Sequence, residues 1–180
     1  MWRPLFIVAA WLSLASAKAL RSGGLFALAH GAASMMVACP DGWTHGAGRC
    51  YKLTDASLTA LGCVELCGEN ASLACLRSAE ENAAATALLV SDSRSSFAWI
   101  GNYQRLGSVE PDGGWDVCAS GEAVNYTNWA PGQPAVNYIS REDCAVIYHD
   151  GGWEDMGLSS VFPLSCLCEL GAEPKPEYLA

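Results

Sequence analysis

The sequence contains no apolar run that approaches the roughly 20 residues of a membrane-spanning helix, so we expect no membrane span. Basic residues are few: 10 Lys and Arg stand against 19 Asp and Glu, giving a formal net charge of −9. This acidity argues against nucleic acids and anionic membranes as partners, because both are negatively charged, and it is compatible with cation binding. Internal repeats are absent, and 180 residues suit one domain with short ends.

A recognisable catalytic constellation is also missing. No nucleophile, base and orienting residue occur at a spacing that indicates a known reaction. The three histidines, His30, His45 and His149, are scattered, and each is more easily explained as a structural or exposed residue. We therefore expect no catalytic residues and a binding protein rather than an enzyme.

The first 17 residues have the pattern of a secretory signal peptide. Arg3 provides a positive start, Leu5–Leu14 an apolar run, and residues 15–17 a small-residue cleavage site. We therefore expect residues 1–17 to be removed and the protein to be secreted. Residues 18–38 are interpreted as an N-terminal linker, because their apolar stretch is again too short to span a membrane.

Nine cysteines are present, which in a secreted protein predicts a disulfide framework rather than a metal cluster. Their positions are Cys39, Cys50, Cys63, Cys67, Cys75, Cys118, Cys144, Cys166 and Cys168. The odd number leaves at least one thiol without a partner in the chain. A Cys39–Cys50 bridge across a short loop rich in turn residues would close a small N-terminal hairpin.

Two helices are predicted in the first half of the chain. The first is expected to begin with Thr54 as its N-cap, to carry apolar residues at helical spacing as far as Leu66, and to stop at Gly68. The second is expected to open at Ser78 and Glu81, which form a capping-box pattern, and to continue through the alanine-rich segment that follows.

From residue 97 onward the pattern changes to short β-strands separated by turn residues. We expect a strand at 97–102, a hairpin at 145–156 with a tight primed turn at Asp150-Gly151, and a last strand at 162–170. The segment 102–137 has few regular signals. Long irregular loops in small domains are usually functional, so this region is expected to carry the binding site.

The order of these landmarks resembles the C-type lectin domain. A Cys–Cys hairpin and a cysteine-bearing helix precede, in order, the segments LACLRSAEEN, WIG, YTNWAPGQP, EDC, GGWED and CLCEL. The resemblance covers residues 39–170 and leaves 171–180 as a polar tail. It implies a disulfide-stapled α+β fold of the C-type lectin-like kind, with two helices flanking two small antiparallel sheets and a long ligand-binding loop.

The same resemblance implies disulfide pairs. One of the family's two bridges corresponds to Cys67–Cys168 in this sequence. The other begins at Cys144, but its usual partner position falls near Leu158, which is not a cysteine. Cys166 is the nearest candidate partner, and its side chain is expected to share a strand face with Cys168.

The remaining cysteines then suggest a further pair and a free thiol. Cys63 and Cys75 would connect the first helix to the segment after it. Cys118 would be left unpaired, and a secreted protein could use it for a disulfide-linked dimer. Each bridge that closes a long loop would add roughly 2–4 kcal/mol of stability.

Sugar-binding members of the family hold calcium through oxygen atoms at five positions. The matching positions here are Gln133, Ala135, Glu142, Glu154 and Asp155. Four of them keep a side-chain oxygen, whereas Ala135 has none. Because calcium takes about 6–8 oxygen ligands, the resemblance implies a weakened calcium site with Gln133, Glu142, Glu154 and Asp155 as metal ligands.

Two further residues of the loop complete the predicted ligand-binding set. The resemblance implies a cis peptide bond before Pro134, and Asn137 could turn its amide into the gap left at Ala135. Asn70 and Asn125 begin N-glycosylation sequons, and the second lies in the loop region.

Taken with the resemblance, these observations predict a secreted lectin-like recognition protein whose partners are glycans or glycoproteins, with calcium as a cofactor. One alternative is a calcium-independent domain that binds proteins. Another is a matrix- or mineral-associated protein that binds through its acidity rather than through a defined pocket.

Overall fold

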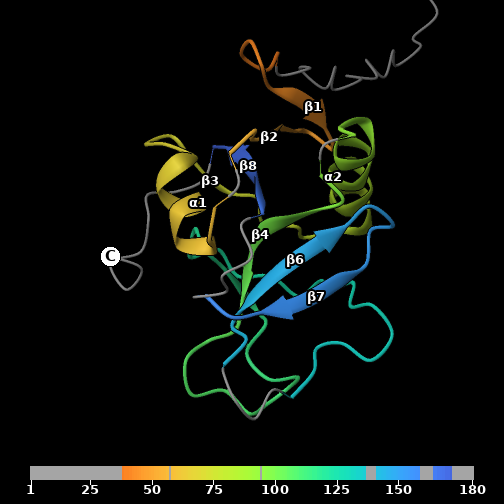
Figure 1. Cartoon of the computed structure of the whole chain (residues 1–180). Coiled ribbons are helices and arrows are strands. Elements are labelled where there is room, and N and C mark those ends of the chain that lie inside the picture. Colours follow the sequence, from red (N-terminus) through yellow and green to blue (C-terminus); the bar gives the residue numbers. More distant parts are fainter. Residues whose placement is uncertain (1–37, 57, 94, 137–140, 159–163, 172–180) are drawn as a thin grey trace, which may run out of the picture. The chain divides into compact units, whose positions relative to one another are not determined.

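The computed structural model describes residues 38–56, 58–93, 95–136, 141–158 and 164–171 (Figure 1). Predictions for the signal peptide, for most of the linker, for Asn137 and for nearly all of the polar tail lie outside the described residues. None of the described helices is long and apolar enough to cross a membrane.

The described part of the chain contains eight connected strands in the order β1-β2-β8-β4-β6-β7, with β3 paired to β8 and β5 paired to β4. β4 and β8 pair in parallel, and the other pairings between these strands are antiparallel. Two antiparallel groups therefore join through one parallel contact. The bounds are β1 Thr44–Gly46, β2 Arg49–Leu53, β3 Ala71–Leu73, β4 Phe97–Tyr103, β5 Val117–Cys118, β6 Cys144–Tyr148, β7 Trp153–Met156 and β8 Ser165–Leu170.

Helix α1 (Ala60–Leu66) begins later than the sequence pattern predicted. Its N-cap is Thr59, whose hydroxyl accepts a hydrogen bond from the Gly62 N–H at 3.3 Å. Thr54 belongs to an extended segment beside β8, where it donates its N–H to the Cys166 carbonyl and accepts the Cys166 N–H with its hydroxyl, both at 3.0 Å. The predicted start was wrong because pairing with β8 outweighs the local capping signal.

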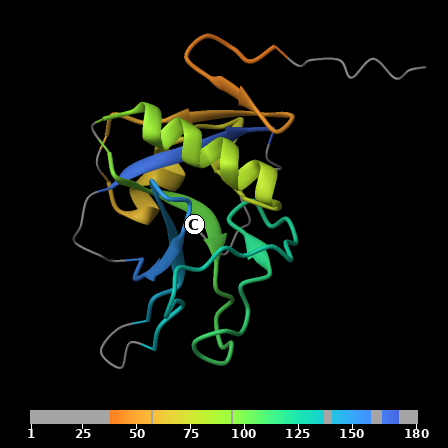
Figure 2. The same cartoon turned by 90° about the vertical axis from the view of Figure 1, so that its right-hand side faces the viewer.

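Helix α2 (Ala79–Ser91) confirms the second prediction. The Ser78 hydroxyl accepts the Glu81 N–H at 3.3 Å, which is one half of the capping box. The Glu81 carboxylate accepts the N–H of Arg77 instead of completing the box at Ser78. Figure 2 looks at this helix from its outer side, and the helix packs against β1, β2 and β6.

The central strands are covered on both faces, because successive side chains of a strand point to opposite sides. Ile100 and Ile147 face the core beneath α2, whereas Trp99 and Val146 face the core beneath α1. Trp153 is also fully buried.

The hairpin of β6 and β7 is confirmed, but its turn differs from the prediction. Gly151 has a positive φ of 88°, whereas Asp150 does not, so a turn with two left-handed residues is ruled out. Tyr148 and Gly152 close the loop through a hydrogen bond of 2.9 Å. The arrangement is a longer hairpin loop with glycine at its left-handed position.

Two predicted disulfides, Cys39–Cys50 and Cys67–Cys168, are confirmed. The predicted Cys144–Cys166 pair is wrong, because Cys166 bonds to Cys63, with the two Cα atoms 5.4 Å apart. Cysteines four apart share a helix face, and cysteines two apart share a strand face. α1 and β8 are therefore joined by two neighbouring bridges.

The predicted Cys63–Cys75 pair is wrong for the same reason, and Cys75 bonds to Cys118 instead. A free Cys118, and the dimer that it would link, are therefore also ruled out. The ninth cysteine, Cys144, is the free one and is buried at the start of β6. Burial raises the pKa of its thiol to about 12, so the thiol is neutral at physiological pH.

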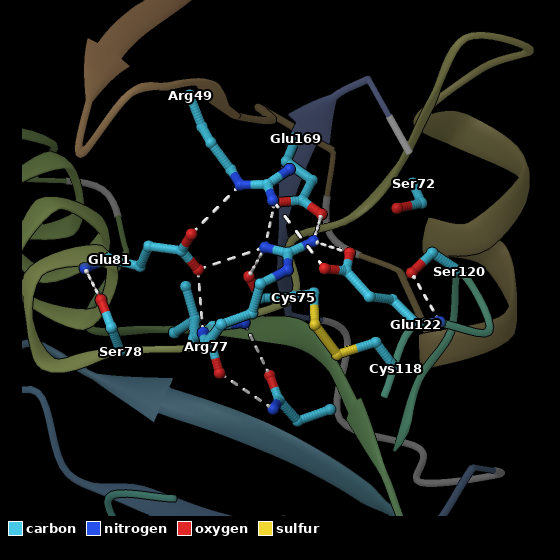
Figure 3. A network of polar contacts seen from close by, with 12 residues as sticks. Arg49, Ser72, Cys75, Arg77, Ser78, Glu81, Cys118, Ser120, Glu122 and Glu169 are labelled. Atoms are coloured by element: carbon cyan, nitrogen blue, oxygen red, sulfur yellow. Dashed lines mark hydrogen bonds and ion pairs between the residues drawn. A yellow bond between two sulfur atoms is a disulfide. The ribbon is translucent and has the colours of Figure 1, made fainter. Parts of the chain in front are cut away.

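Arg77, between β3 and α2, is the centre of a network of charged side chains (Figure 3). Its guanidinium lies 2.7 Å from Glu169 on β8 and 3.1 Å from Glu81 on α2. It also lies 2.6 Å from Glu122, in the loop that follows β5. Arg49 on β2 adds a second guanidinium, with Nε 3.1 Å from Glu81. The network thus connects four separate segments of the chain.

Burial and pairing act against each other in this network. Burial raises the pKa of Glu169, whose side chain is fully buried, while its hydrogen bond to Arg77 acts in the opposite direction. Burial also disfavours the charged form of Arg77, but hydrogen bonds to Glu169 and Glu122 outweigh it and raise the pKa of the guanidinium. The partly buried arginine therefore stays charged, and Glu81, Glu122 and Glu169 each have a cationic partner.

Candidate functional site

The loop at 128–136 lies beside β7 and forms the candidate binding site. Backbone hydrogen bonds of 2.9 Å run from the Trp153 N–H to the Asn128 carbonyl and from the Ala130 N–H to the Trp153 carbonyl. The Ala135 N–H donates to the Asp155 carboxylate at 3.0 Å, further along the same strand. These contacts place the Gln-Pro segment of the loop next to the acidic end of β7.

Gln133 and Pro134 follow the exposed turn at 131–132 in this loop. The Gln133–Pro134 peptide bond is cis, which confirms the prediction, and Pro134 is buried. The Gln133 N–H donates to the Ala130 carbonyl at 2.9 Å. Its side-chain Oε1 is buried and has no hydrogen-bond partner among the described residues. A buried acceptor without a partner is costly, so this atom is suited to a ligand.

Asp155 is the buried acid of the site. Burial raises the pKa of its carboxyl, and the nearby negative charges of Glu142 and Glu154 raise it further. The backbone hydrogen bond from Ala135 acts in the opposite direction. The charged carboxylate is therefore held at a free-energy cost, which a bound cation would lower.

Glu154 takes a different direction. Because neighbouring strand residues alternate, its side chain lies on the face of β7 opposite to that of Asp155. There its Oε2 accepts a hydrogen bond from the Tyr148 hydroxyl at 2.5 Å. Burial and this bond raise the pKa of Tyr148 to about 12. The sequence analysis missed Tyr148, although the hairpin pattern predicts that both residues lie on one face.

The three predicted metal-binding carboxylates, Glu142, Glu154 and Asp155, do not converge as expected. Within the described ranges, no group of three or more acidic, histidine or cysteine side chains is arranged to hold a metal ion. The alternation of β7 is the physical reason. The oxygen donors that fit calcium are the unpartnered Gln133 Oε1, the buried Asp155 carboxylate and the nearby acid Glu142.

Other predicted features of the site have mixed outcomes. Trp115, in the irregular segment 102–137, is buried and meets the Trp129 ring edge-on, so it is part of the core. Asn70 and Asn125 are both exposed, as glycan attachment requires, but whether they are glycosylated stays a prediction.

Comparison with known families identifies the domain. The family model described as the Lectin C-type domain matches residues 56–170. This chain belongs to the C-type lectin family. The match includes α1, α2 and every residue of the candidate site, so the site is part of the lectin domain.

Two curated relatives support this assignment. Over 121 residues, this C-type lectin is 31% identical to Collectin-43 of Bos taurus, covering 65% of the chain and 35% of the relative. Over 125 residues it is 36% identical to Asialoglycoprotein receptor 2 of Mus musculus, covering 65% of the chain and 38% of the relative. The alignments therefore span little more than a third of these relatives.

Solved structures agree with the fold. The C-type lectin CEL-I from Cucumaria echinata is 28% identical, with a TM-score of 0.61. The superposition covers 75% of this chain and 99% of CEL-I. Human lithostathine has a TM-score of 0.62 at 19% identity, covering 74% of this chain and 99% of its own. The second likeness is evidence for the fold alone.

Proposed function

We propose that this C-type lectin recognises glycans or glycoproteins through the loop at 128–136, with a weakly held calcium ion. Membership of the family supports glycan binding, and its members are in general binding proteins rather than enzymes. The observation that carries the proposal is the buried, unpartnered Gln133 Oε1 beside the buried Asp155. The Gln133 Oε1 has no hydrogen-bond partner among the described residues, and the Asp155 carboxylate accepts a hydrogen bond from a neutral backbone N–H.

Calcium would be held by Gln133, Glu142 and Asp155, with Glu154 contributing only if it leaves Tyr148. When bound, the ion supplies open coordination positions for sugar hydroxyl groups. Pro134 is buried between Gln133 and Ala135, and the Ala135 N–H orients the Asp155 carboxylate. Asn137, which belongs to the proposed ligand-binding set, lies outside the described residues.

The site is weak because it has few donors. Ala135 contributes no side-chain oxygen, and Glu154 is occupied by Tyr148. Calcium binds tightly when about 6–8 oxygen atoms surround it, and its affinity rises with the number of carboxylates. Most of the coordination positions would therefore be filled by water or by the ligand.

The wider setting of the protein is part of the same proposal. We assign residues 1–17 to a signal peptide, 18–38 to a linker, 39–170 to the lectin domain and 171–180 to a tail. Secretion is supported by the four disulfides of the domain, because such bonds persist in oxidising compartments.

The test is calcium titration by calorimetry on the secreted protein, followed by glycan-array binding with and without a chelator. Ala135→Asp should tighten calcium binding and strengthen calcium-dependent glycan binding, because it adds a carboxylate beside Gln133. Ala83→Asp, on the exposed side of α2, adds the same charge elsewhere and should change neither.

One result would replace the proposal. If neither the natural protein nor Ala135→Asp binds calcium at millimolar concentration, the site does not work with calcium. The second candidate, a calcium-independent domain that binds proteins, would then take its place. The observation that favours this candidate is the separation of the three carboxylates within the described residues.

A further inference from the structure

A cavity lies on the α1 side of the sheet. It has a volume of about 500 Å³ and lies between α1, the end of β4, β5 and the start of β6. Cys144 on β6 lines it, and this side chain belongs to the core beneath α1. Asp155 pairs with Ala145, which belongs to the core beneath α2. The main wall of the cavity therefore lies on the opposite face of the sheet from Asp155.

The walls of this cavity are mainly aliphatic. The apolar side chains that line it include Ala60, Leu61, Val64, Leu73 and Leu158. Leu61 and Leu106 line it and are also exposed, at 49% and 87%. The cavity therefore opens to solvent beside two large apolar side chains.

The charged groups at the cavity already have partners. Arg105 Nη2 lies 2.6 Å from Asp116, and Asp143 lies 2.8 Å from Arg141. Gln104 donates through Nε2 to the Gly113 carbonyl at 2.9 Å, whereas its buried Oε1 has no partner among the described residues. The wall thus offers one unused acceptor and no strong attraction for a charged ligand.

Cys144 adds to the apolar character of the wall. It is buried and is the one cysteine of the nine that forms no disulfide. A buried free cysteine behaves as a small hydrophobic group. Cys144 lines the cavity and has no disulfide partner, so no disulfide bond crosses the space between Cys144 and Leu158.

We propose that this cavity binds the aliphatic chain of a small amphiphile. Its volume is within the range of small-molecule sites, and such sites are mostly apolar with a few polar groups. Tyr103 is the one aromatic side chain among the lining residues, so the walls favour an aliphatic chain over stacked rings. The proposal does not rest on calcium or on the proposed glycan binding.

The first experiment is calorimetric titration of the intact protein with 1-alkanols, from hexanol to decanol. Affinity should rise roughly fourfold for each added methylene group until the cavity is full, and then stop rising. A rise that continues without limit would indicate adsorption to the surface and overturn the proposal. The absence of saturable binding would overturn it as well.

Substitutions locate the binding. Leu61→Glu replaces an apolar side chain at the mouth of the cavity with a hydrated charge and should weaken alkanol binding by about fivefold or more, because the alkyl chain loses apolar contact there. Val90→Glu is the control, since Val90 is exposed on the other helix and does not line the cavity. Equal effects of the two changes, or no effect of Leu61→Glu, would contradict the proposal.

A second variant and a second readout guard against a folding defect. Val117→Trp, from β5, should fill the cavity and abolish alkanol binding while the melting transition stays cooperative. Bound alkanol should also raise the melting temperature of the natural protein, because it binds only the folded state, and should leave that of Val117→Trp unchanged. Unchanged binding in Val117→Trp together with an equal rise in its melting temperature would place the ligand elsewhere.

A last comparison separates recognition of the alkyl chain from recognition of the polar head group of the ligand. An alkanol and an alkyl galactoside of equal chain length should bind this cavity with similar affinity in the presence of a chelator. Binding of the galactoside alone would show that the sugar is recognised rather than the chain, and would overturn the proposal. Loss of calcium binding would leave the result unchanged, so the two proposals fail separately.

Discussion

Two acidic regions of this lectin differ in the hydrogen-bond donors that their carboxylates have. Around Arg77, three glutamates are paired with guanidinium groups, and one of them, Glu169, is fully buried. Around Gln133, the recorded hydrogen bonds of Asp155 and Glu154 come from a backbone N–H and a phenol, which are both neutral donors. The first region carries its own cations, whereas the second presents negative charge toward the loop.

The difference separates a structural role from a binding role. Paired carboxylates connect α2, β2, β8 and the loop at Glu122, so their charges are used inside the fold. At Asp155 the pKa is raised by burial and by neighbouring acids, so the folded protein holds unfavourable charge there. Such a site gains stability when a cation binds, which the Arg77 network has no need of.

The largest expected effect is the loss of Arg77. Arg77→Met should lower the free energy of unfolding by about 3–5 kcal/mol, because it leaves Glu169 buried without a cationic partner. Denaturation with urea measures the change. The matched control is Arg105→Met, which removes an exposed ion pair with Asp116 and should cost less than about 1 kcal/mol. Similar losses in both variants would mean that the network around Arg77 stabilises the fold no more than an exposed ion pair does.

The next effect concerns calcium. Asp155→Asn should weaken calcium binding by about tenfold or more, a loss of about 1.4 kcal/mol, because it removes the buried negative charge. Calorimetry measures the affinity. Glu65→Gln, at an exposed position of α1, removes one charge outside the candidate site and should leave calcium binding unchanged. Calcium binding that is equally strong in Asp155→Asn would remove this residue from the site.

The same substitution should act with the opposite sign in calcium-free protein. The folded-state pKa of Asp155 is raised, so its contribution to stability is fully present at low pH and is lost as the pH rises through that pKa. Asp155→Asn should therefore stabilise the calcium-free protein at neutral pH, by less than Arg77→Met destabilises it. Thermal melting should show the gain disappearing below about pH 4, where the free carboxyl is protonated. A loss of stability at neutral pH would contradict the comparison.

The smallest effect is expected at Glu122. Hydrogen bonding to Arg77 lowers the pKa of this partly exposed carboxyl, so its contribution to stability is present above its unfolded-state pKa and is lost on acidification. Glu122→Gln should destabilise the protein by less than about 1 kcal/mol at neutral pH. The difference from the natural protein should vanish at low pH, the reverse of the sign expected at Asp155. A gain of stability at neutral pH would disprove the assignment.

The sequence alone was sufficient where the signal is local or where the order of landmarks is specific. The cap of α2 at Ser78, the hairpin of β6 and β7, and the Cys39–Cys50 bridge each depend on residues close together in the chain. The family resemblance was carried by ordered segments, and it supplied Cys67–Cys168 and the cis bond before Pro134. These predictions did not require knowledge of which distant segments meet.

Tertiary contacts decided the rest. Thr54 resembles a helix cap, but pairing with β8 holds it in an extended segment. Cys63 could join several partners by sequence, and only the packing of α1 on β8 selects Cys166. Helix and strand periodicities determine which side chains share a face of one element, but they contain no information about which elements are in contact.

The sequence by itself determined the family, most of the secondary structure and the oxygen-bearing residues of the loop. The tertiary structure decided that Asp155 is buried, that Glu154 is bound to Tyr148, and that Cys144 is the free thiol. The physical reason is that burial, charge pairing and disulfide choice depend on distances between segments far apart in the chain. Those distances are set by the packing of α1 and α2 on the two faces of the sheet.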